Sequence, residues 1–232
     1  MTQVSAAQRA RFSQIEIATP AILGAVVAGI CMLGYLELAE DLTISPKIAE
    51  FDLALTSLIQ SWRMPALTWL FRAATWSAST LTVTSLVLVA VAVLVWSCNH
   101  REALVVALVV GSGTGLGAVA KRVTERPRPP AANALIELPT SYSFPSGHTL
   151  AALLLWTVIA LAVLRTVRAT WARWLAVCGG LLLTVLVGTS RVYLGVHWPS
   201  DVLASWLLGV AWLSMTLGGF FAWERAVGPA EE

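Results

Sequence analysis

The chain has 232 residues, of which 57% are hydrophobic and only 12% are charged. A soluble domain carries about 25% charged residues, so this composition, with a mean hydropathy of +0.76, indicates an integral membrane protein. The net charge of +2 is too small to indicate a nucleic-acid partner.

Six apolar runs are long enough to cross a hydrocarbon core of about 30 Å. The sequence therefore predicts an all-α fold, a single domain over 1–232 built as a bundle of about six transmembrane helices. No small-residue cleavage site follows the first run, so we expect a retained anchor and not a cleaved signal peptide. The runs cover residues 20–39, 79–97, 102–120, 148–165, 171–190 and 201–222.

The segment 41–78, between the first two runs, is more polar than its neighbours. Its stretch "FDLALTSLIQSW" has apolar residues at helical spacing with polar residues between them. This pattern predicts one or two helices that lie at the membrane interface on the extracytoplasmic side, and it leaves open a partial dip into the lipid.

Three polar clusters fall at the same membrane face when the runs are counted along the chain. The stretch "KRVTERPRP" (121–129) ends the third run, "PSGH" (145–148) begins the fourth, and "SRVYLGVHWPSD" (190–201) joins the fifth to the sixth. Two of the three histidines lie in these clusters. We therefore expect the segment 121–201 to form one site.

The cluster at Ser146, Gly147 and His148 suits an anion. A helix that starts after Ser-Gly presents free backbone N–H groups and the positive end of its dipole, and glycine lets an anion approach the backbone closely. An N-cap serine beside a solvated His148 is the alternative, purely structural interpretation.

His197 and Asp201 lie four residues apart around Pro199, which suits the first turn of a helix. A carboxylate near one ring nitrogen fixes the tautomer and leaves the other nitrogen free to attack or to accept a proton. Taken alone, the pair is as readily an interfacial polar contact.

Lys121, Arg128 and Arg191 each lie near the end of a run, where a basic residue is often only a boundary anchor. Together they would bring three positive charges to a phosphoryl group that carries about two negative ones. Phosphoryl transfer needs chiefly such positioning and hydrogen-bond donors. We expect no metal and no other cofactor, because no carboxylate cluster and no Cys/His spacing suits one.

Together, these motifs resemble a known signature. Lys-x6-Arg-Pro from Lys121, Pro-Ser-Gly-His from Pro145 and Ser-Arg-x5-His-x3-Asp from Ser190 resemble the type-2 phosphatidic acid phosphatase family. These are membrane lipid phosphatases that share the motifs with vanadium haloperoxidases. All three motifs are complete and in the same order, and six spans of lipid length disfavour the soluble haloperoxidases.

The resemblance implies a role for each motif residue. His197 would be the nucleophile that forms a phosphohistidine, Asp201 would orient its ring, and His148 would serve as general acid and then as general base. The signature assigns no role to Arg122 or Arg126. The implied phosphate-binding residues are Lys121, Arg128, Ser146, Gly147 and Arg191.

The expected function is therefore a metal-independent phosphatase acting on a membrane lipid phosphomonoester or diphosphate. Undecaprenyl diphosphate, phosphatidylglycerol phosphate and phosphatidate are the candidate substrates. A lipid-to-lipid phosphotransferase and a non-catalytic protein that only binds or moves lipid phosphates are the alternatives, although a binder would not require both histidines.

The orientation follows from the basic residues of the loops. With cytoplasmic termini, seven lie inside and eight outside, and setting aside the three expected ligands leaves seven against five. We therefore expect a bacterial cytoplasmic (inner) membrane protein whose active site faces the extracytoplasmic side.

Overall fold

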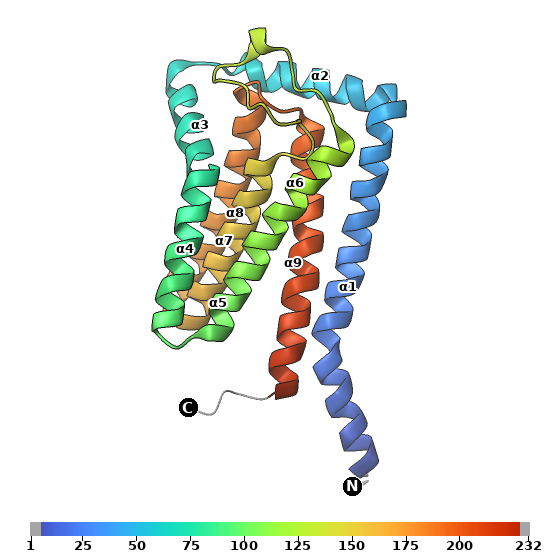
Figure 1. Ribbon diagram of the computed structural model, residues 1–232, viewed down its shortest axis with the longest axis vertical. Coiled ribbons are helices and arrows are strands. Elements are labelled where there is room, and N and C mark those ends of the chain that lie inside the picture. Colours follow the sequence, from blue (N-terminus) through green and yellow to red (C-terminus); the bar gives the residue numbers. More distant parts are fainter. Residues whose placement is uncertain (1–5, 228–232) are drawn as a thin grey trace.

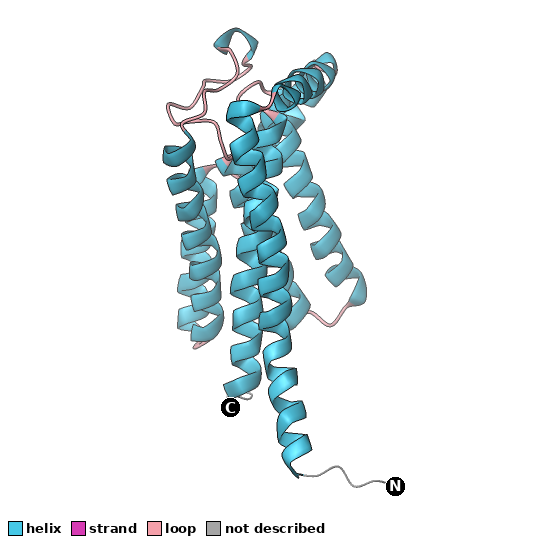
Figure 2. Ribbon diagram, turned by 90° about the vertical axis from the view of Figure 1, so that its right-hand side faces the viewer, coloured by secondary structure: helices cyan, strands magenta, loops and turns pink. Residues whose placement is uncertain are grey.

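The computed structural model describes residues 6–227, which form helices, turns and loops but no strand (Figure 2). The predicted all-α fold is thus confirmed. The elements in chain order are α1 (Ala6–Ile44), α2 (Pro46–Ser61), α3 (Pro65–Ser77), α4 (Thr80–Trp96), α5 (His100–Val106), the π-helical η1 (Ala107–Ser112), α6 (Gly113–Thr124), the 3-10 turn η2 (Ala131–Asn133), α7 (Gly147–Thr166), α8 (Thr170–Tyr193) and α9 (Pro199–Val227).

Five segments of the described chain are long and apolar enough to cross a membrane, and α5, η1 and α6 together form one of them. The helices α3 and α4 meet the same criterion as a pair, bent by 44° at residues 78 and 79. The maximum of six spans agrees with the prediction. The five single segments are Ile17–Leu42, His100–Thr124, Gly147–Thr166, Thr170–Tyr193 and Pro199–Val227.

The helix α7 lies inside the bundle, where it packs against α6, α8 and α9. Every residue from Thr149 to Leu155 is buried, so the first half of this helix is surrounded on all sides. On α6, Gly117 makes this packing possible, because a Cβ there would lie 2.6 Å from the Leu150 side chain. By contrast, α1 packs mainly along α9 at the edge of the bundle (Figure 1).

The two helices of the segment 41–78 run in different directions. The helix α2 does lie across one end of the bundle, but α3 packs lengthwise on α8 and leads into α4 (Figure 1). The cause is a tie between α3 and α8: the Tyr193 hydroxyl accepts a hydrogen bond from the Met64 backbone N–H (3.0 Å) and contacts the Thr68 hydroxyl (2.9 Å).

The long loops gather at the same end of the bundle as α2 (Figures 1 and 2). After α6, Glu125 adopts a left-handed conformation (φ 48°), and the prolines of "RPRPP" prevent the helix from continuing. The chain returns to the bundle at Gly147, where α7 begins. This end therefore holds the end of α6, the start of α7 and the α8–α9 loop, which carry the three motifs.

Candidate active site

A cavity of about 520 Å³ opens between α4, α6 and α7. The motif residues converge on it from three separate parts of the chain. The side that faces the long loops is lined by six of the eight predicted site residues: Lys121, Arg128, Gly147, His148, Arg191 and His197.

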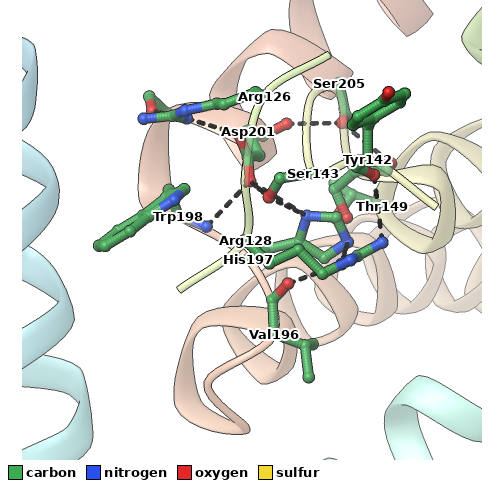
Figure 3. Close-up of polar contacts among 12 residues, drawn as sticks. Arg126, Arg128, Tyr142, Ser143, Thr149, Val196, His197, Trp198, Asp201 and Ser205 are labelled. Carbon is green, nitrogen blue, oxygen red and sulfur yellow. Dashed lines mark hydrogen bonds and ion pairs between the residues drawn. The ribbon is translucent and has the colours of Figure 1, made fainter. Parts of the chain in front are cut away.

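His197 lies in the loop before α9, and Asp201 lies in the first turn of that helix. The ring atom Nδ1 is 3.1 Å from Asp201 Oδ2, and both side chains are buried. The same oxygen accepts hydrogen bonds from the Trp198 backbone N–H (3.0 Å) and from the Ser143 hydroxyl (Figure 3). A carboxylate held in this way can orient an imidazole ring.

The tautomer of His197 follows from its two partners. Arg128 Nη1 lies 3.1 Å from His197 Nε2, and because arginine only donates hydrogen bonds, Nε2 must be the acceptor. The hydrogen therefore sits on Nδ1 and points to Asp201. Burial lowers the pKa of His197 to about 3, although the hydrogen bond to Asp201 opposes this shift. The ring is thus neutral at neutral pH, and its Nε2 lone pair faces Arg128 in the wall of the cavity.

Arg128 is held by the two loops that frame the cavity. Its Nη1 donates to the Val196 carbonyl oxygen (2.7 Å), and its Nε donates to the Ser141 carbonyl oxygen (2.8 Å). Burial lowers the pKa of this guanidinium, but an arginine remains charged in a protein. A phosphoryl group beside His197 Nε2 would meet this cation directly.

The other two cations approach from α6 and α8. Lys121 Nζ donates to the carbonyl oxygens of Tyr142 (2.8 Å) and Ser143 (3.2 Å). Arg191 is 2% exposed, and its Nη1 donates to the Thr75 hydroxyl on α3 (2.6 Å). Its buried Nε has no hydrogen-bond partner within residues 6–227. A buried cationic donor without an acceptor fits an anion-binding site.

Two of the three predicted site residues at the start of α7 line the cavity. Gly147 and His148 line the cavity, and the His148 ring makes no hydrogen bond to other residues of the described chain. Ser146 is fully buried and is not among the residues that line the cavity. Its hydroxyl accepts from Thr149 (2.9 Å), and its backbone N–H donates to the Asp201 carbonyl oxygen (3.2 Å).

Several polar residues of this region had no role in the sequence analysis. Ser143 and Arg126 both donate to the Asp201 carboxylate, Thr75 holds Arg191, and Asp52 on α2 forms an ion pair with Arg126 (2.6 Å). No spacing rule connects α2 or α3 with the motifs, so only the second arginine of "KRVTERPRP" gave any signal. Within the described residues, no group of three His, Cys, Asp or Glu side chains could hold a metal ion.

The fold and the cavity define a helical membrane protein with a buried histidine–aspartate pair beside three cations. The family model of the PAP2 superfamily matches residues 102–225, which is more than half of the chain. The chain belongs to the PAP2 superfamily, and the family predicted from the motifs is confirmed.

Individual relatives are similar over the same region. The chain is 45% identical over 76 residues to undecaprenyl-diphosphatase of Sulfolobus acidocaldarius. The aligned region covers 33% of this chain and 32% of the relative. The chain is 38% identical over 111 residues to phosphatidylglycerophosphatase B of Bacillus subtilis, with 47% and 53% covered. The matched regions thus span about half or less of these two relatives.

A solved structure extends the similarity to most of the fold. It is the crystal structure of a transmembrane PAP2 type phosphatidylglycerolphosphate phosphatase from Bacillus subtilis, to which this chain is 26% identical. The TM-score is 0.77, and the alignment covers 88% of this chain and 98% of that one. The protein is therefore an integral membrane protein with the fold of membrane PAP2 phosphatases.

Proposed function

We propose that this protein is a metal-independent lipid phosphatase that forms a phosphohistidine on His197. One observation carries the proposal: the unprotonated Nε2 of His197 lies in a cavity wall shared with three cations, while Nδ1 is held by Asp201. A neutral, oriented imidazole beside fixed positive charges is what nucleophilic attack on a phosphoryl group requires.

The reaction has two steps. In the first, the Nε2 lone pair of His197 forms a bond to phosphorus, the ester P–O bond breaks, and protonated His148 gives its proton to the leaving oxygen. In the second, neutral His148 takes a proton from water, whose oxygen attacks phosphorus. The P–N bond then breaks, so that inorganic phosphate leaves and both histidines return to their starting states.

The shape of the cavity supports a lipid substrate. Beyond the cations, the cavity continues between α4 and α6, along a wall of threonine, valine and glycine residues. A Cβ added at Gly111 or Gly115 would meet no atom within 4 Å, so these two glycines leave the wall open. A phosphorylated headgroup at the cations would place its apolar chain along this wall.

Relatives suggest which lipids to test first. Their names specify undecaprenyl diphosphate and phosphatidylglycerol phosphate, and phosphatidate offers the same phosphomonoester on a shorter headgroup. We propose further that the site faces the extracytoplasmic side of a bacterial cytoplasmic membrane. This is supported by the basic residues of the loops, which number seven on the opposite side and five on this side once Lys121, Arg128 and Arg191 are set aside.

The decisive experiment is phosphate release by the detergent-purified protein in EDTA. The panel holds the three lipids and a soluble phosphomonoester, each assayed with the wild type, His197→Ala and His100→Ala. His100 is an exposed histidine at the start of α5, away from the cavity, and serves as the matched control. We expect release from at least one lipid, a loss of about 10⁴-fold or more in His197→Ala, and no loss in His100→Ala.

Each alternative predicts a different result. Phosphate recovered on a second lipid by mass spectrometry would indicate a phosphotransferase, and lipid binding without any release would indicate a non-catalytic protein. Equal release by His197→Ala and wild type would overturn the assignment of the nucleophile. Loss of activity in EDTA, restored by a divalent cation, would contradict metal independence.

A further inference from the structure

Arg126 joins two buried carboxylates that belong to different helices. Its Nη1 donates to Asp201 Oδ1 (2.5 Å) on α9, and its Nη2 donates to Asp52 Oδ2 (2.6 Å) on α2. The Asp52 side chain is 2% exposed and that of Asp201 is 0% exposed. The chain of contacts thus runs from α2, which crosses the end of the bundle, to the carboxylate beside His197.

The two oxygens of Asp201 have separate partners. Oδ2 accepts from the His197 ring, the Trp198 backbone N–H and the Ser143 hydroxyl. Oδ1 accepts only from Arg126 among the side chains that the structure describes. Arg126 therefore fixes the rotation of the carboxylate about its Cβ–Cγ bond, and with it the direction from which Oδ2 meets the ring (Figure 3).

Asp52 fixes the backbone next to the same carboxylate. Its Oδ1 accepts from the Ser200 backbone N–H (2.8 Å), and its Oδ2 accepts from the Ser200 hydroxyl (2.6 Å). That N–H belongs to the first turn of α9, where backbone donors lack partners within the helix. An acidic side chain there also complements the positive end of the helix dipole. Asp52 thus caps α9 from another helix, one residue before Asp201.

We infer that Asp52 and Arg126 are positioning residues that act through Asp201 on His197, an inference that rests on the proposed function. If these residues served only to join α2 to α9, the contacts of Asp52 with Ser200 would be enough. Here the guanidinium shares a carboxylate with the imidazole, so a change in Arg126 must alter the charge and the orientation that the imidazole meets.

The charges around His197 give the direction of the effect on pH dependence. The ring faces Asp201 from α9, Arg191 from α8, Lys121 from α6, His148 from α7 and Arg128 from the α6–α7 loop. Arg126 lies behind Asp201 and offsets its charge. Without this cation, Asp201 would stabilise a protonated His197 more strongly, so the acid limb of the kcat/KM profile would move to higher pH.

The test compares Arg126→Gln, Arg126→Lys and Asp52→Asn on a lipid that the wild type hydrolyses, and Asp52→Asn should lower kcat in the same direction as Arg126→Gln. We expect Arg126→Gln to lower kcat about 10–100-fold, as for other residues that orient a catalytic ligand, with KM changed less than about threefold. The acid limb should move to higher pH. Arg126→Lys keeps the charge and should recover part of kcat, and it carries the test if Arg126→Gln does not fold.

Arg63→Gln is the matched control for a broken arginine contact at this end of the bundle. Arg63 follows α2 and donates to the carbonyl oxygens of Tyr193 (2.8 Å) and Asn133 (2.7 Å), but within residues 6–227 it contacts no carboxylate. We expect this variant to keep the wild-type kcat and pH profile. An equal loss in Arg63→Gln and Arg126→Gln, or a loss of Arg126→Gln confined to KM, would overturn the inference.

A second readout does not depend on turnover. In protein labelled with ¹⁵N-histidine, the Nδ1–H resonance of His197 reports its hydrogen bond to Asp201. We expect this resonance to move or broaden in Arg126→Gln and to stay in place in Arg63→Gln. If the wild type released no phosphate, the proposed function would fail, but this spectrum would still test the positioning role. An unchanged spectrum in Arg126→Gln would overturn the positioning role.

Discussion

At the end of the bundle that holds the cavity, an arginine lies between two carboxylates, and the opposite end repeats this arrangement. Arg126 lies between Asp52 and Asp201, and Arg165 lies between Glu102 and Glu224. The three side chains near the cavity are 15%, 2% and 0% exposed. Those at the opposite end are 28%, 33% and 30% exposed.

The same arrangement of one arginine and two carboxylates therefore has different consequences at the two ends. Exposed ion pairs are screened by water and stabilise a fold only slightly, whereas a buried charge that loses its partner is strongly destabilised. The partners differ as well. Asp201 holds the ring of His197, while Arg165 packs over the rings of Phe220 (5.3 Å) and Phe221 (5.4 Å) and contacts no residue of the cavity. We expect catalysis to depend on the buried charges near the cavity. The exposed charges at the opposite end should contribute only modestly to the stability of the fold.

The largest effect in this comparison should come from Asp201→Asn. Every side-chain or backbone group that contacts the two carboxylate oxygens is a donor, so the amide nitrogen of asparagine would face a donor in either orientation. The ring of His197 would lose its fixed tautomer, and we expect kcat to fall about 10³–10⁴-fold. Phosphate release by the folded variant measures this, with Glu224→Gln as the control at the opposite end. A variant that keeps a tenth of wild-type activity would contradict it.

A smaller effect should appear in the pH dependence of stability. Burial lowers the pKa of folded His197 from 6.5 to about 3, so between these values the unfolded chain takes up a proton that the folded chain does not. Stability is therefore complete above pH 6.5 and falls as the pH drops. Between pH 7 and pH 5 this group should cost about 2 kcal/mol, and His197→Gln should remove that part of the slope.

Unfolding of the detergent-solubilised protein by SDS at pH 7, 6 and 5 gives the required free energies of unfolding. His100→Gln, at the opposite end of the bundle, is the matched control for a lost histidine. The same slope in the wild type and in His197→Gln would show that other groups cause the pH dependence.

Much of this comparison follows from the sequence, because it rests on span counting and on local motifs. Each motif adjoins the end of an apolar run, and the number of membrane crossings between any two motifs is even. Lys121, His148 and His197 therefore had to lie at the same membrane face. The pair of His197 and Asp201 is local, since the two residues lie only four apart in the sequence, on either side of the start of α9. These parts needed no tertiary information.

The other parts depend on contacts between distant segments. Asp52 lies 74 residues from Arg126, and neither spacing nor composition joins α2 to the "RPRP" loop. Ser146 turns away from the cavity because its hydroxyl meets Thr149 and its backbone meets Asp201, a direction that the motif alone does not give. The segment 65–77 has the composition of an interfacial helix, and it is the tie to Tyr193 that directs it along α8.

The smallest effect should come from Arg165→Gln. This change removes two exposed ion pairs, each of which contributes about 0–1 kcal/mol. It also removes two cation–π contacts, each of which contributes about 0.5–1 kcal/mol at an exposed site. We expect the free energy of unfolding to fall by about 1–2 kcal/mol and kcat to stay within about twofold of the wild type. A double-mutant cycle with Glu224→Gln isolates the pair, whose coupling energy should stay below about 1 kcal/mol. A tenfold loss of kcat in Arg165→Gln would mean that the helices transmit a disturbance from one end of the bundle to the other. The ends would then differ in exposure but not in function, and the contrast between Arg126 and Arg165 would fail.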